Sequence, residues 1–355
     1  MRDAGAKRIL LVKLSSIGDV VHSLPVAAAL RRRFPDAYIA WAVGPAAADV
    51  VTGNPHLSET LVVGGKDEEG LGVASLPPIA SPMRLRRALR ERSFEVALDL
   101  QGLFKSALLA HLSGARDRIG FRSIREGAFL FYNRWPVRDR RDVHAVEVYL
   151  DFAEALGAPR EPVEFTIAVS EQDRRAVDDL LAGRENLAAL IPGARWESKR
   201  WLPERFAATA DALAEEFELT SVVLGGEGDG GLARAIVEAA RSPVLDLTGK
   251  TSLKQAAEVL RRCRVTVGND TGPLYVSAAM GTPTVGLFGP TDPRRLGPYG
   301  EGHAKVVTDV ECAPCRNRRC KPLRCMEAIG AARVVETVRG LLVGVRERSG
   351  AHGAA

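Results

Sequence analysis

Short apolar runs alternate with helical patterns along almost the whole chain of 355 residues, and this alternation strongly constrains the fold. Runs such as "YIAWAV" (38–43) and "LAALI" (187–191) are apolar at every position, which is typical of strands buried on both faces of a parallel sheet. The candidate strands are 8–13, 38–43, 60–63, 95–99, 187–191, 221–225, 244–247, 265–268 and 284–288. The candidate helices are 22–33, 84–92, 142–156, 171–182, 203–217, 230–241, 252–262, 272–280 and 331–346. The pattern predicts an α/β protein with parallel sheets covered by helices.

The alternation is interrupted between residues 157 and 170, where a glycine and two prolines end a helix before an expected polar strand. We therefore predict two doubly wound, Rossmann-like domains of similar size, residues 1–165 and 166–348, facing a central cleft. The helix at 331–346 belongs to the second domain and has the option of packing back on the first. Because ligands of such sheets bind beyond the carboxyl ends of the strands, the loops there are the candidate site.

Composition narrows the class of protein. The content of hydrophobic residues is 46% and no apolar run approaches the ~20 residues of a membrane span. With no signal-peptide pattern at the N-terminus, we expect a cytoplasmic protein. The net charge of +5 and basic runs such as "MRLRRALRERS" (83–93) fit either solvated helix faces or an anionic partner. The few aromatic residues do not interleave with these runs, so we expect no nucleic-acid partner.

The first candidate strand leads into "KLSSIGDVVHSLP" (13–25), a turn that opens a helix. Strand, turn and helix in this order resemble a phosphate-binding loop, but the turn has one glycine and ends in the acid Asp19. The helix N-terminus favours the ionised carboxylate, which would repel a diphosphate. This loop is therefore not expected to hold a nucleotide.

Three loops in the second half of the chain favour a nucleotide diphosphate. In "GNDTGP" (268–273), backbone N–H groups at a helix N-terminus form an anion site beside Thr271, although a plain helix cap explains the same residues. In "IPGARWESKRW" (191–201), cations including Arg195 and Lys199 lie between a strand and a helix. In "VVLGGEGD" (222–229), Glu227 is a candidate acceptor for ribose hydroxyls. The fingerprints of NAD-binding and P-loop proteins are missing, which disfavours those chemistries.

These motifs, together with "DLQGLFKSALLAHLSGARDRIGF" (99–121), resemble in their order the motifs of the family 9 glycosyltransferases, the ADP-heptose:lipopolysaccharide heptosyltransferases. The resemblance extends from about residue 8 to about residue 330. It implies a GT-B fold, with the acceptor in the N-terminal domain and the nucleotide sugar in the C-terminal one. It also implies an inverting, metal-independent transfer of heptose from ADP-heptose to Kdo-lipid A or heptosyl-Kdo-lipid A, with no cofactor and no metal-binding residues.

The resemblance assigns roles to individual residues. Asp19 matches the catalytic aspartate, the general base, because an inverting transfer needs one base to deprotonate the acceptor hydroxyl. Lys199 matches the lysine that neutralises the diphosphate. The donor-binding residues implied are Lys199, Arg195, Glu227, Asp270, Thr271 and Gly272. The acceptor-binding residues implied are Ser15, Ser16, Gly18, Gln101 and Lys105. A lipid-anchored acceptor further implies a peripheral position on the cytoplasmic face of an anionic inner membrane.

Two departures from the family pattern leave the sugar nucleotide open. Tyr275 stands where the family's turn usually continues to a His, and Ala194 and Arg195 stand where some heptosyltransferases have hydroxyl residues. A family 9 transferase with another donor or acceptor is therefore an alternative. A non-catalytic nucleotide-sugar-binding or redox-sensing protein is another, in which the cysteines would be the functional part.

Four of the five cysteines cluster near the C-terminal end, with the spacing C-x₂-C-x₄-C-x₄-C; they are Cys312, Cys315, Cys320 and Cys325. Four thiols can hold tetrahedral zinc, but gaps of four are not a common zinc-ribbon spacing. Zinc and free thiols both remain open. The fifth, Cys263, is expected in the core.

Overall fold

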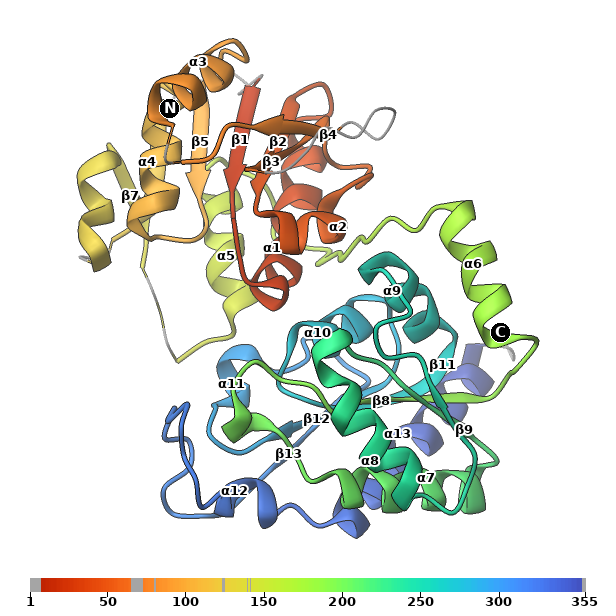
Figure 1. Cartoon of the computed structure of the whole chain (residues 1–355). Coiled ribbons are helices and arrows are strands. Elements are labelled where there is room, and N and C mark those ends of the chain that lie inside the picture. The colour runs from red at the N-terminus through yellow and green to blue at the C-terminus, as the bar shows by residue number, and fades with distance from the viewer. Residues whose placement is uncertain are drawn as a thin grey trace. The chain divides into compact units, whose positions relative to one another are not determined.

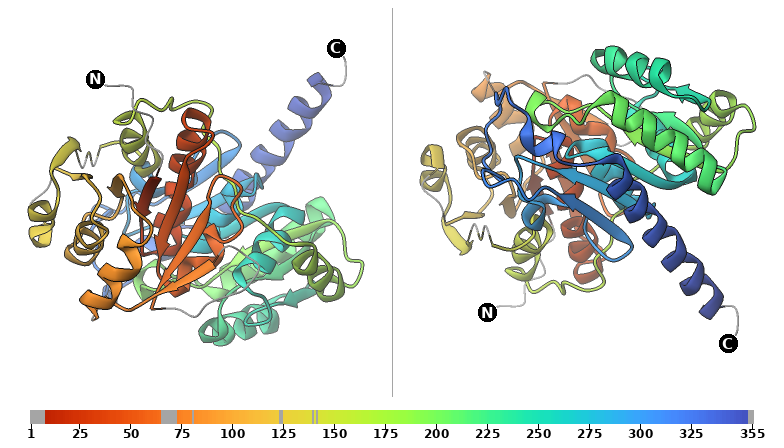
Figure 2. Two further views of the ribbon diagram at one scale, coloured as in Figure 1. Left: turned by 90° about the horizontal axis from the view of Figure 1, so that it is seen from above. Right: turned by 90° about the horizontal axis from the view of Figure 1, so that it is seen from below.

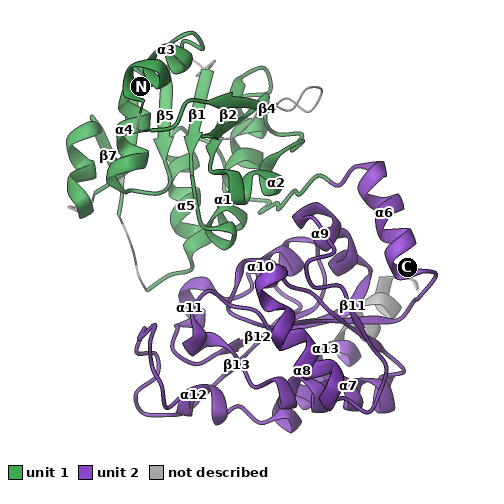
Figure 3. Cartoon of the chain, in the orientation of Figure 1, with its two compact units in different colours: residues 1–168 green, residues 169–355 purple. Residues whose placement is uncertain are grey.

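The computed structural model describes residues 8–64, 73–79, 81–122, 125–138, 140 and 142–352. The chain divides into two compact units, residues 1–168 and 169–355 (Figure 3). This division falls three residues after the boundary expected at residue 165. Each unit has its own parallel sheet, and we describe each by itself.

The first unit contains a seven-stranded sheet in the order β4-β3-β2-β1-β5-β6-β7, and all its strand pairs are parallel (Figure 1). Its strands are β1 (Arg8–Val12), β2 (Tyr38–Val43), β3 (Glu59–Val63), β4 (Val73–Leu76), β5 (Val96–Asp99), β6 (Asp117–Phe121) and β7 (Arg134–Val137). The strand order reverses between β1 and β5, so the loops that follow these two strands diverge to opposite sides of the sheet. Such a switch point is where ligands of doubly wound sheets bind.

Helices of the first unit begin in the loops that follow these strands (Figures 1 and 2). They are α1 (Ile17–Arg33), η1 (Pro45–Ala47), α2 (Ala48–Val51), α3 (Pro82–Arg90), α4 (Phe104–Leu112), η2 (Arg125–Phe131) and α5 (Ala145–Glu154). Helix α1 packs against α5, the helix that follows β7 near the end of this unit. Its buried residues include Val20 and Leu24, whereas the basic residues of its last turn are at least partly exposed and complement the helix dipole.

The second unit repeats the architecture with a six-stranded parallel sheet in the order β10-β9-β8-β11-β12-β13. Its strands are β8 (Leu187–Ile191), β9 (Thr220–Val223), β10 (Val244–Asp246), β11 (Cys263–Asn269), β12 (Thr284–Phe288) and β13 (His303–Val307). Its helices are α6 (Glu171–Leu181), η3 (Glu197–Lys199), α7 (Pro203–Phe217), η4 (Glu227–Asp229), α8 (Gly230–Ala239), α9 (Leu253–Arg262), α10 (Gly272–Ala279), α11 (Pro293–Leu296), α12 (Arg324–Glu327) and α13 (Ala331–His352). Here the switch point lies between β8 and β11.

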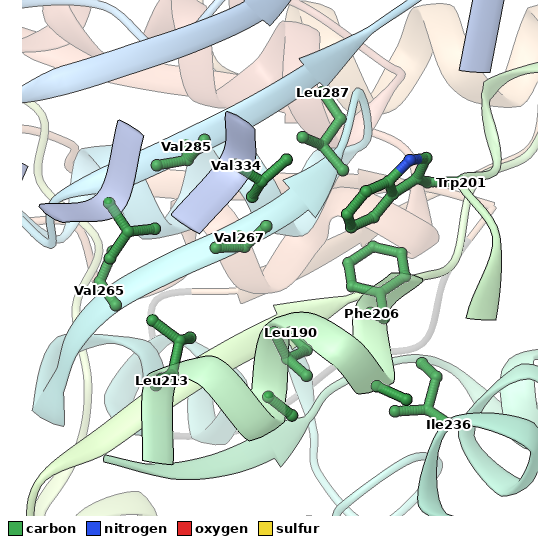
Figure 4. Packing of buried hydrophobic residues seen from close by; sticks show 14 of the residues in the cluster. Leu190, Trp201, Phe206, Leu213, Ile236, Val265, Val267, Val285, Leu287 and Val334 are labelled. Carbon is green, nitrogen blue, oxygen red and sulfur yellow. The ribbon is translucent and has the colours of Figure 1, made fainter. Parts of the chain in front are cut away.

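The core of the second unit fixes the loop that follows β8. Trp201 is buried and meets Phe206 edge to face, with ring centroids 4.9 Å apart, among the aliphatic side chains of β11 and β12 (Figure 4). The indole N–H of Trp201 donates to the carbonyl of Ile329 at 2.9 Å. The ring of Trp201 is packed in the core and its N–H group is hydrogen-bonded, so the end of the loop between β8 and α7 is fixed.

Helix α13 packs against α7 and β13, and its buried residues Val334 and Val338 belong to the core of the second unit. These contacts assign the helix to the second unit and give no support to the option that it packs on the first. The polar strand expected between residues 157 and 170 is wrong. After α5 the chain runs to α6 without joining either sheet.

Candidate active site

Asp19 is the third residue of α1, at the carboxyl end of β1. Its Oδ2 accepts the backbone N–H of Ser16 at 3.2 Å and the hydroxyl of Ser16 at 2.7 Å. This is the capping arrangement expected of an acid at the third helical position. Its second oxygen, Oδ1, faces the hydroxyl of Tyr149 in α5 at 3.4 Å. Asp19 is partly exposed. One of its oxygens holds the start of the helix, and the other lies at the switch point of the first unit.

A buried lysine lies behind this carboxylate. Lys13, the first residue after β1, is 4% exposed. Its ammonium donates to the hydroxyl of Tyr149 at 2.8 Å and to the carbonyl of Leu100 at 3.1 Å. Lys13, Tyr149 and Asp19 therefore form one connected polar group in which the tyrosine hydroxyl lies between the cation and the anion.

The electrostatics of this group favour an ionised Asp19. Burial opposes ionisation, yet the Lys13 ammonium and the hydrogen bonds from Ser16 hold the pKa of Asp19 below its ordinary value. Burial would lower the pKa of Lys13, but Tyr149 and the carboxylates of Asp19 and Asp99 raise it. His22, one turn further along α1, has a pKa lowered to about 3 by burial and by His144. Asp19 is thus a carboxylate and His22 a neutral imidazole at neutral pH.

The loop after β5 is hydrogen-bonded to the loop after β1 through Gln101. The side-chain Oε1 of Gln101 accepts the backbone N–H groups of Leu14 at 2.7 Å and Ser15 at 3.2 Å. Gln101 is itself fixed because its own N–H donates at 2.9 Å to the buried carboxylate of Asp99. The carbonyl of Gln101 is therefore committed to positioning the Asp19 loop, and its amide NH₂ is the group that remains for an acceptor.

In the second unit, Lys199 and Asp270 meet across the switch point. Lys199 ends η3 after β8, and Asp270 follows β11. The ammonium of Lys199 donates to Oδ2 of Asp270 at 2.6 Å, and both side chains are largely buried. Lys199 also lies 4.5 Å from the centroid of the Trp196 ring. An ammonium has three donors, so the ion pair fixes Lys199 and leaves donor capacity for a further anion.

Two hydroxyl groups complete the shell around Asp270. Thr291, in the loop after β12, donates to Oδ2 at 2.7 Å. Tyr275 of α10 donates to Oδ1. Asp270 therefore accepts hydrogen bonds from the protein on both oxygens, and its direct role is to position Lys199. Thr271 directly precedes α10 without a side-chain capping hydrogen bond, and Gly272 is the first residue of the helix. Their backbone N–H groups therefore lie at a helix N-terminus next to Asp270, the partner of Lys199.

The remaining donor candidates lie in neighbouring loops. Arg195 is exposed between β8 and η3, and Glu227 is the exposed first residue of η4 after β9. A side chain at Gly193 would collide with Asp229, which shows that the loops after β8 and β9 approach each other closely. Arg318 lies 4.7 Å from the centroid of the same Trp196 ring as Lys199.

The structure thus brings the sequence-predicted residues together in two groups. The first group is Ser15, Ser16, Gly18, Asp19 and Gln101, with Lys105 exposed in the first turn of α4. The second group is Lys199, Asp270, Thr271 and Gly272, flanked by Arg195 and Glu227. Sequence reasoning missed Lys13, Tyr149 and Thr291. A charged residue directly after an apolar strand was the available signal for Lys13.

The cysteine cluster does not form a metal centre in the described part of the chain. No group of three or more His, Cys, Asp or Glu side chains within the described ranges is arranged to hold a metal ion. Cys312 and Cys315 are exposed, Cys325 is buried, and all five cysteines are free thiols. Cys263 begins β11, and burial raises its pKa to about 12.

None of the helices in the described ranges combines the length and the apolar character that are needed to cross a bilayer.

Comparisons of the sequence and of the structure with known proteins all point to the family 9 glycosyltransferases. The model of glycosyltransferase family 9 (heptosyltransferase) matches residues 82–325. Lipopolysaccharide heptosyltransferase 1 of Pseudomonas aeruginosa is 31% identical over 322 residues, which cover 88% of this chain and 87% of the relative. A glycosyl transferase family 9 structure from Veillonella parvula superimposes with a TM-score of 0.81 at 24% identity and covers 96% of this chain and 100% of its own. The structure of E. coli ADP-heptose lps heptosyltransferase II superimposes with a TM-score of 0.78 at 23% identity, and the match covers 96% of this chain and 99% of that one. The expected GT-B architecture of two Rossmann-like units is confirmed.

Proposed function

The chain belongs to glycosyltransferase family 9, and from this premise we propose that it transfers heptose from ADP-heptose to the inner core of lipopolysaccharide. The acceptor is Kdo-lipid A or heptosyl-Kdo-lipid A. The name of the Pseudomonas relative supports the acceptor class, and the name of the E. coli ADP-heptose lps heptosyltransferase II supports ADP-heptose as the donor. The chain is a glycosyltransferase, and a lipid-anchored acceptor would bring it to the cytoplasmic face of an inner membrane.

The proposed reaction inverts the anomeric centre in one displacement. Asp19 accepts the proton of the acceptor hydroxyl as that oxygen forms a bond to the anomeric carbon of the heptose. The bond between that carbon and the diphosphate breaks, and ADP leaves with the electron pair. Positive charge and oriented N–H groups must stabilise this leaving group without a metal ion or cofactor.

The observation that carries the base assignment is the polar group formed by Asp19, Tyr149 and Lys13. A base must be ionised before it can accept a proton, and the buried Lys13 ammonium favours that form by lowering the pKa of Asp19. Oδ2 caps α1, whereas the contact of Oδ1 with the protein is the longer hydrogen bond from Tyr149 at 3.4 Å, so Oδ1 is the oxygen proposed to accept the proton. The capping contacts on Oδ2 therefore hold the proposed base in place.

The second unit supplies the donor site in this proposal. Lys199 is fixed by Asp270 at the switch point, and the N-terminus of α10 lies beside it. A diphosphate would accept from the ammonium and from the N–H groups near Thr271 and Gly272. Glu227, in the neighbouring loop, would accept from ribose hydroxyls.

The test is an incubation of the chain with ADP-heptose and truncated lipopolysaccharide acceptors of defined structure, with the products analysed by mass spectrometry. We expect the acceptor to gain one heptose and the product to have the inverted anomeric configuration. Replacing Asp19 with Asn should lower kcat by roughly 10³-fold or more while ADP affinity stays near that of the wild type. A near-normal rate for this variant would remove Asp19 as the base.

A second candidate function is the transfer of a different sugar. Tyr275 donates to Asp270 in this chain, at a position where family 9 proteins usually have a His. A screen of ADP-, GDP- and UDP-sugars separates the candidates, because the favoured proposal requires ADP-heptose to give the highest kcat/KM.

A further inference from the structure

Large apolar side chains are unusually exposed on one part of the first unit. In the described part of the chain, seven large hydrophobic residues are exposed, and five of them lie between residues 83 and 135. These five are Met83, Phe104, Phe129, Leu130 and Trp135. Leu130 is 73% exposed and Phe104 is 46% exposed. Exposed apolar patches on a folded protein are commonly interaction sites.

The structure holds these side chains at the surface rather than leaving them in a loose loop. Segment η2 packs against α4, and the ring of Phe131 meets the rings of Phe104 and His111 at 5.4 Å and 5.6 Å. Ala128 and Tyr132 are buried beneath it, and the hydroxyl of Tyr132 donates to Asp99 at 2.6 Å. With these neighbours anchored inward, Phe129 and Leu130 are turned outward. We call the surface formed by η2 and the exposed residues of α3 and α4 the η2 face.

Arginines of α3 and β6 lie near the apolar residues of the η2 face. Helix α3 packs against α4, and its Arg86 and Arg90 are exposed. Both are close enough to His111 in α4 to lower its pKa, in addition to the effect of burial. Arg118 lies against η2 and donates to the carbonyl of Phe131 at 2.8 Å. Residues 82–140 contain 13 Arg and Lys against 6 Asp and Glu, an excess larger than the net charge of +5 of the whole chain.

We propose that the η2 face docks this protein on a bilayer that contains anionic phospholipids. Exposed apolar side chains with arginines nearby match such a surface, because the tips of Phe and Leu enter the interfacial region while the guanidinium groups meet phosphates. The inference rests on the proposed function, which requires a membrane-anchored acceptor. It adds the surface that makes the contact, which is formed by η2, α3 and α4 of the first unit.

The experiment measures binding of the whole chain, without substrates, to sedimented vesicles. The vesicles are phosphatidylcholine alone or phosphatidylcholine with phosphatidylglycerol. The wild type should bind the anionic vesicles and bind neutral ones much more weakly. Replacing both Phe129 and Leu130 with Ser should weaken this binding roughly tenfold or more, because two apolar side chains no longer leave water. The matched control is Val237→Ser, which removes an exposed apolar side chain from α8 of the second unit.

A second variant tests the charges independently of the apolar centre. Arg86→Glu with Arg90→Glu should weaken binding to anionic vesicles at least tenfold, whereas Arg234→Glu on α8 should have a smaller effect. All three arginines are exposed, so the folded state should be retained, and a thermal melt checks this. Equal binding by the wild type and both double variants would overturn the proposal. So would equal binding of the wild type to neutral and anionic vesicles.

A transferase assay separates failure of this inference from failure of the proposed function. The F129S/L130S variant should keep its kcat/KM on a water-soluble acceptor without acyl chains. Vesicle binding through the η2 face without heptose transfer would overturn the proposed function alone. Heptose transfer by a chain that does not bind vesicles would overturn the inference alone.

Discussion

At the scale of single residues, the side chain of Asp19 caps a helix and is also the base that we propose. Its Oδ2 satisfies the N–H and hydroxyl of Ser16, as in many helix starts. A residue that only capped α1 would not need a buried lysine behind it. Removing a charge from water is unfavourable unless it is paired, so the ammonium of Lys13 is buried here because of its partners.

Replacing Lys13 with Met should therefore impair the base. Without the ammonium, burial of Asp19 is no longer offset and its pKa rises. We expect the acid limb of the pH profile of kcat/KM to move to higher pH, with a loss of roughly tenfold or more at lower pH that recovers as pH rises. Tyr149→Phe should move the limb in the same direction. A uniform loss at every pH would show that Lys13 acts only on folding, and Lys321→Met is the exposed control.

The sequence singled out the charged residues of this site but not the residues that hold them in place. Asp19, Lys199 and Asp270 stood out because ionisable residues in strand-end loops are unusual and because the motifs resembled a family. Tyr149 gave no such signal, since an aromatic residue in an amphipathic helix is typical of the core. Its contact with Asp19 depends on how α5 packs on α1, about 130 residues further along the chain, and no local pattern encodes that.

At the scale of elements, the contact between α1 and α5 contains a pair of imidazoles. His22 of α1 is 2% exposed, and its ring centroid lies 5.2 Å from that of His144, the residue that caps α5. Because burial and His144 lower the pKa of His22 to about 3, the folded state binds fewer protons than the unfolded state at mildly acidic pH.

Stability should accordingly fall as pH decreases from about 6.5 towards 3. Each pH unit in this window is worth at most about 1.4 kcal/mol from His22, since one proton separates the two states. His22→Gln removes this titration, so its free energy of unfolding should depend less steeply on pH. Urea titrations at several pH values measure the two slopes. Parallel slopes would mean that His22 does not titrate differently in the folded state.

A glycine of β6 shows how closely α4, η2 and the sheet pack. A side chain at Gly120 would collide with the ring of Tyr132, which is held by its hydrogen bond to Asp99. Gly120→Ala should therefore destabilise the protein by about 1–3 kcal/mol. Gly340→Ala in the exposed part of α13 meets no atom and should instead stabilise it by up to about 1 kcal/mol. Thermal melts that place both variants on the same side of the wild type would contradict this packing argument.

The strands that the sequence failed to predict are mostly at sheet edges. Strands β4, β7 and β13 end their sheets, and β6 lies next to an edge. Strands β6, β7 and β13 include charged residues, β7 also has a proline, and β4 is the short segment VASL, so they lack the continuous apolar pattern of β2 or β8. Central strands were predicted to within one or two residues for the opposite reason. Helix α4 was missed because it follows β5 directly in the DLQG segment.

At the scale of the whole molecule, the two units repeat one architecture with opposite charge at the same place. Both have their candidate residues at the switch point of a parallel sheet. The loop after the first strand ends in Asp19 in one unit and in Lys199 in the other. We expect an anionic nucleotide to be repelled by the first loop and attracted by the second, so that the two units would bind different ligands.

This division predicts where ADP acts on the intact protein. Hydrogen exchange with and without ADP should show protection in the loops after β8, β11 and β12, because a bound diphosphate fixes backbone N–H groups at the N-terminus of α10. The loop that contains Asp19 should exchange at an unchanged rate when ADP binds alone. Lys199→Met should lose most of the protection at a given ADP concentration, since the ammonium is the fixed cation of that site. The control Lys254→Met, in α9, should keep it.

Protection by ADP around residues 13–19 would reverse this assignment of the two units. It would mean that the carboxylate of Asp19 tolerates a diphosphate nearby, which requires either protonation or a compensating cation. Lys13 is the cation closest to that role, and the K13M variant distinguishes these cases. If protection of residues 13–19 by ADP disappears in K13M, the buried lysine attracts the nucleotide. If protection appears only in the second unit, the pairing of Lys13 with Asp19 serves the acceptor side, as the electrostatics of the two loops predict.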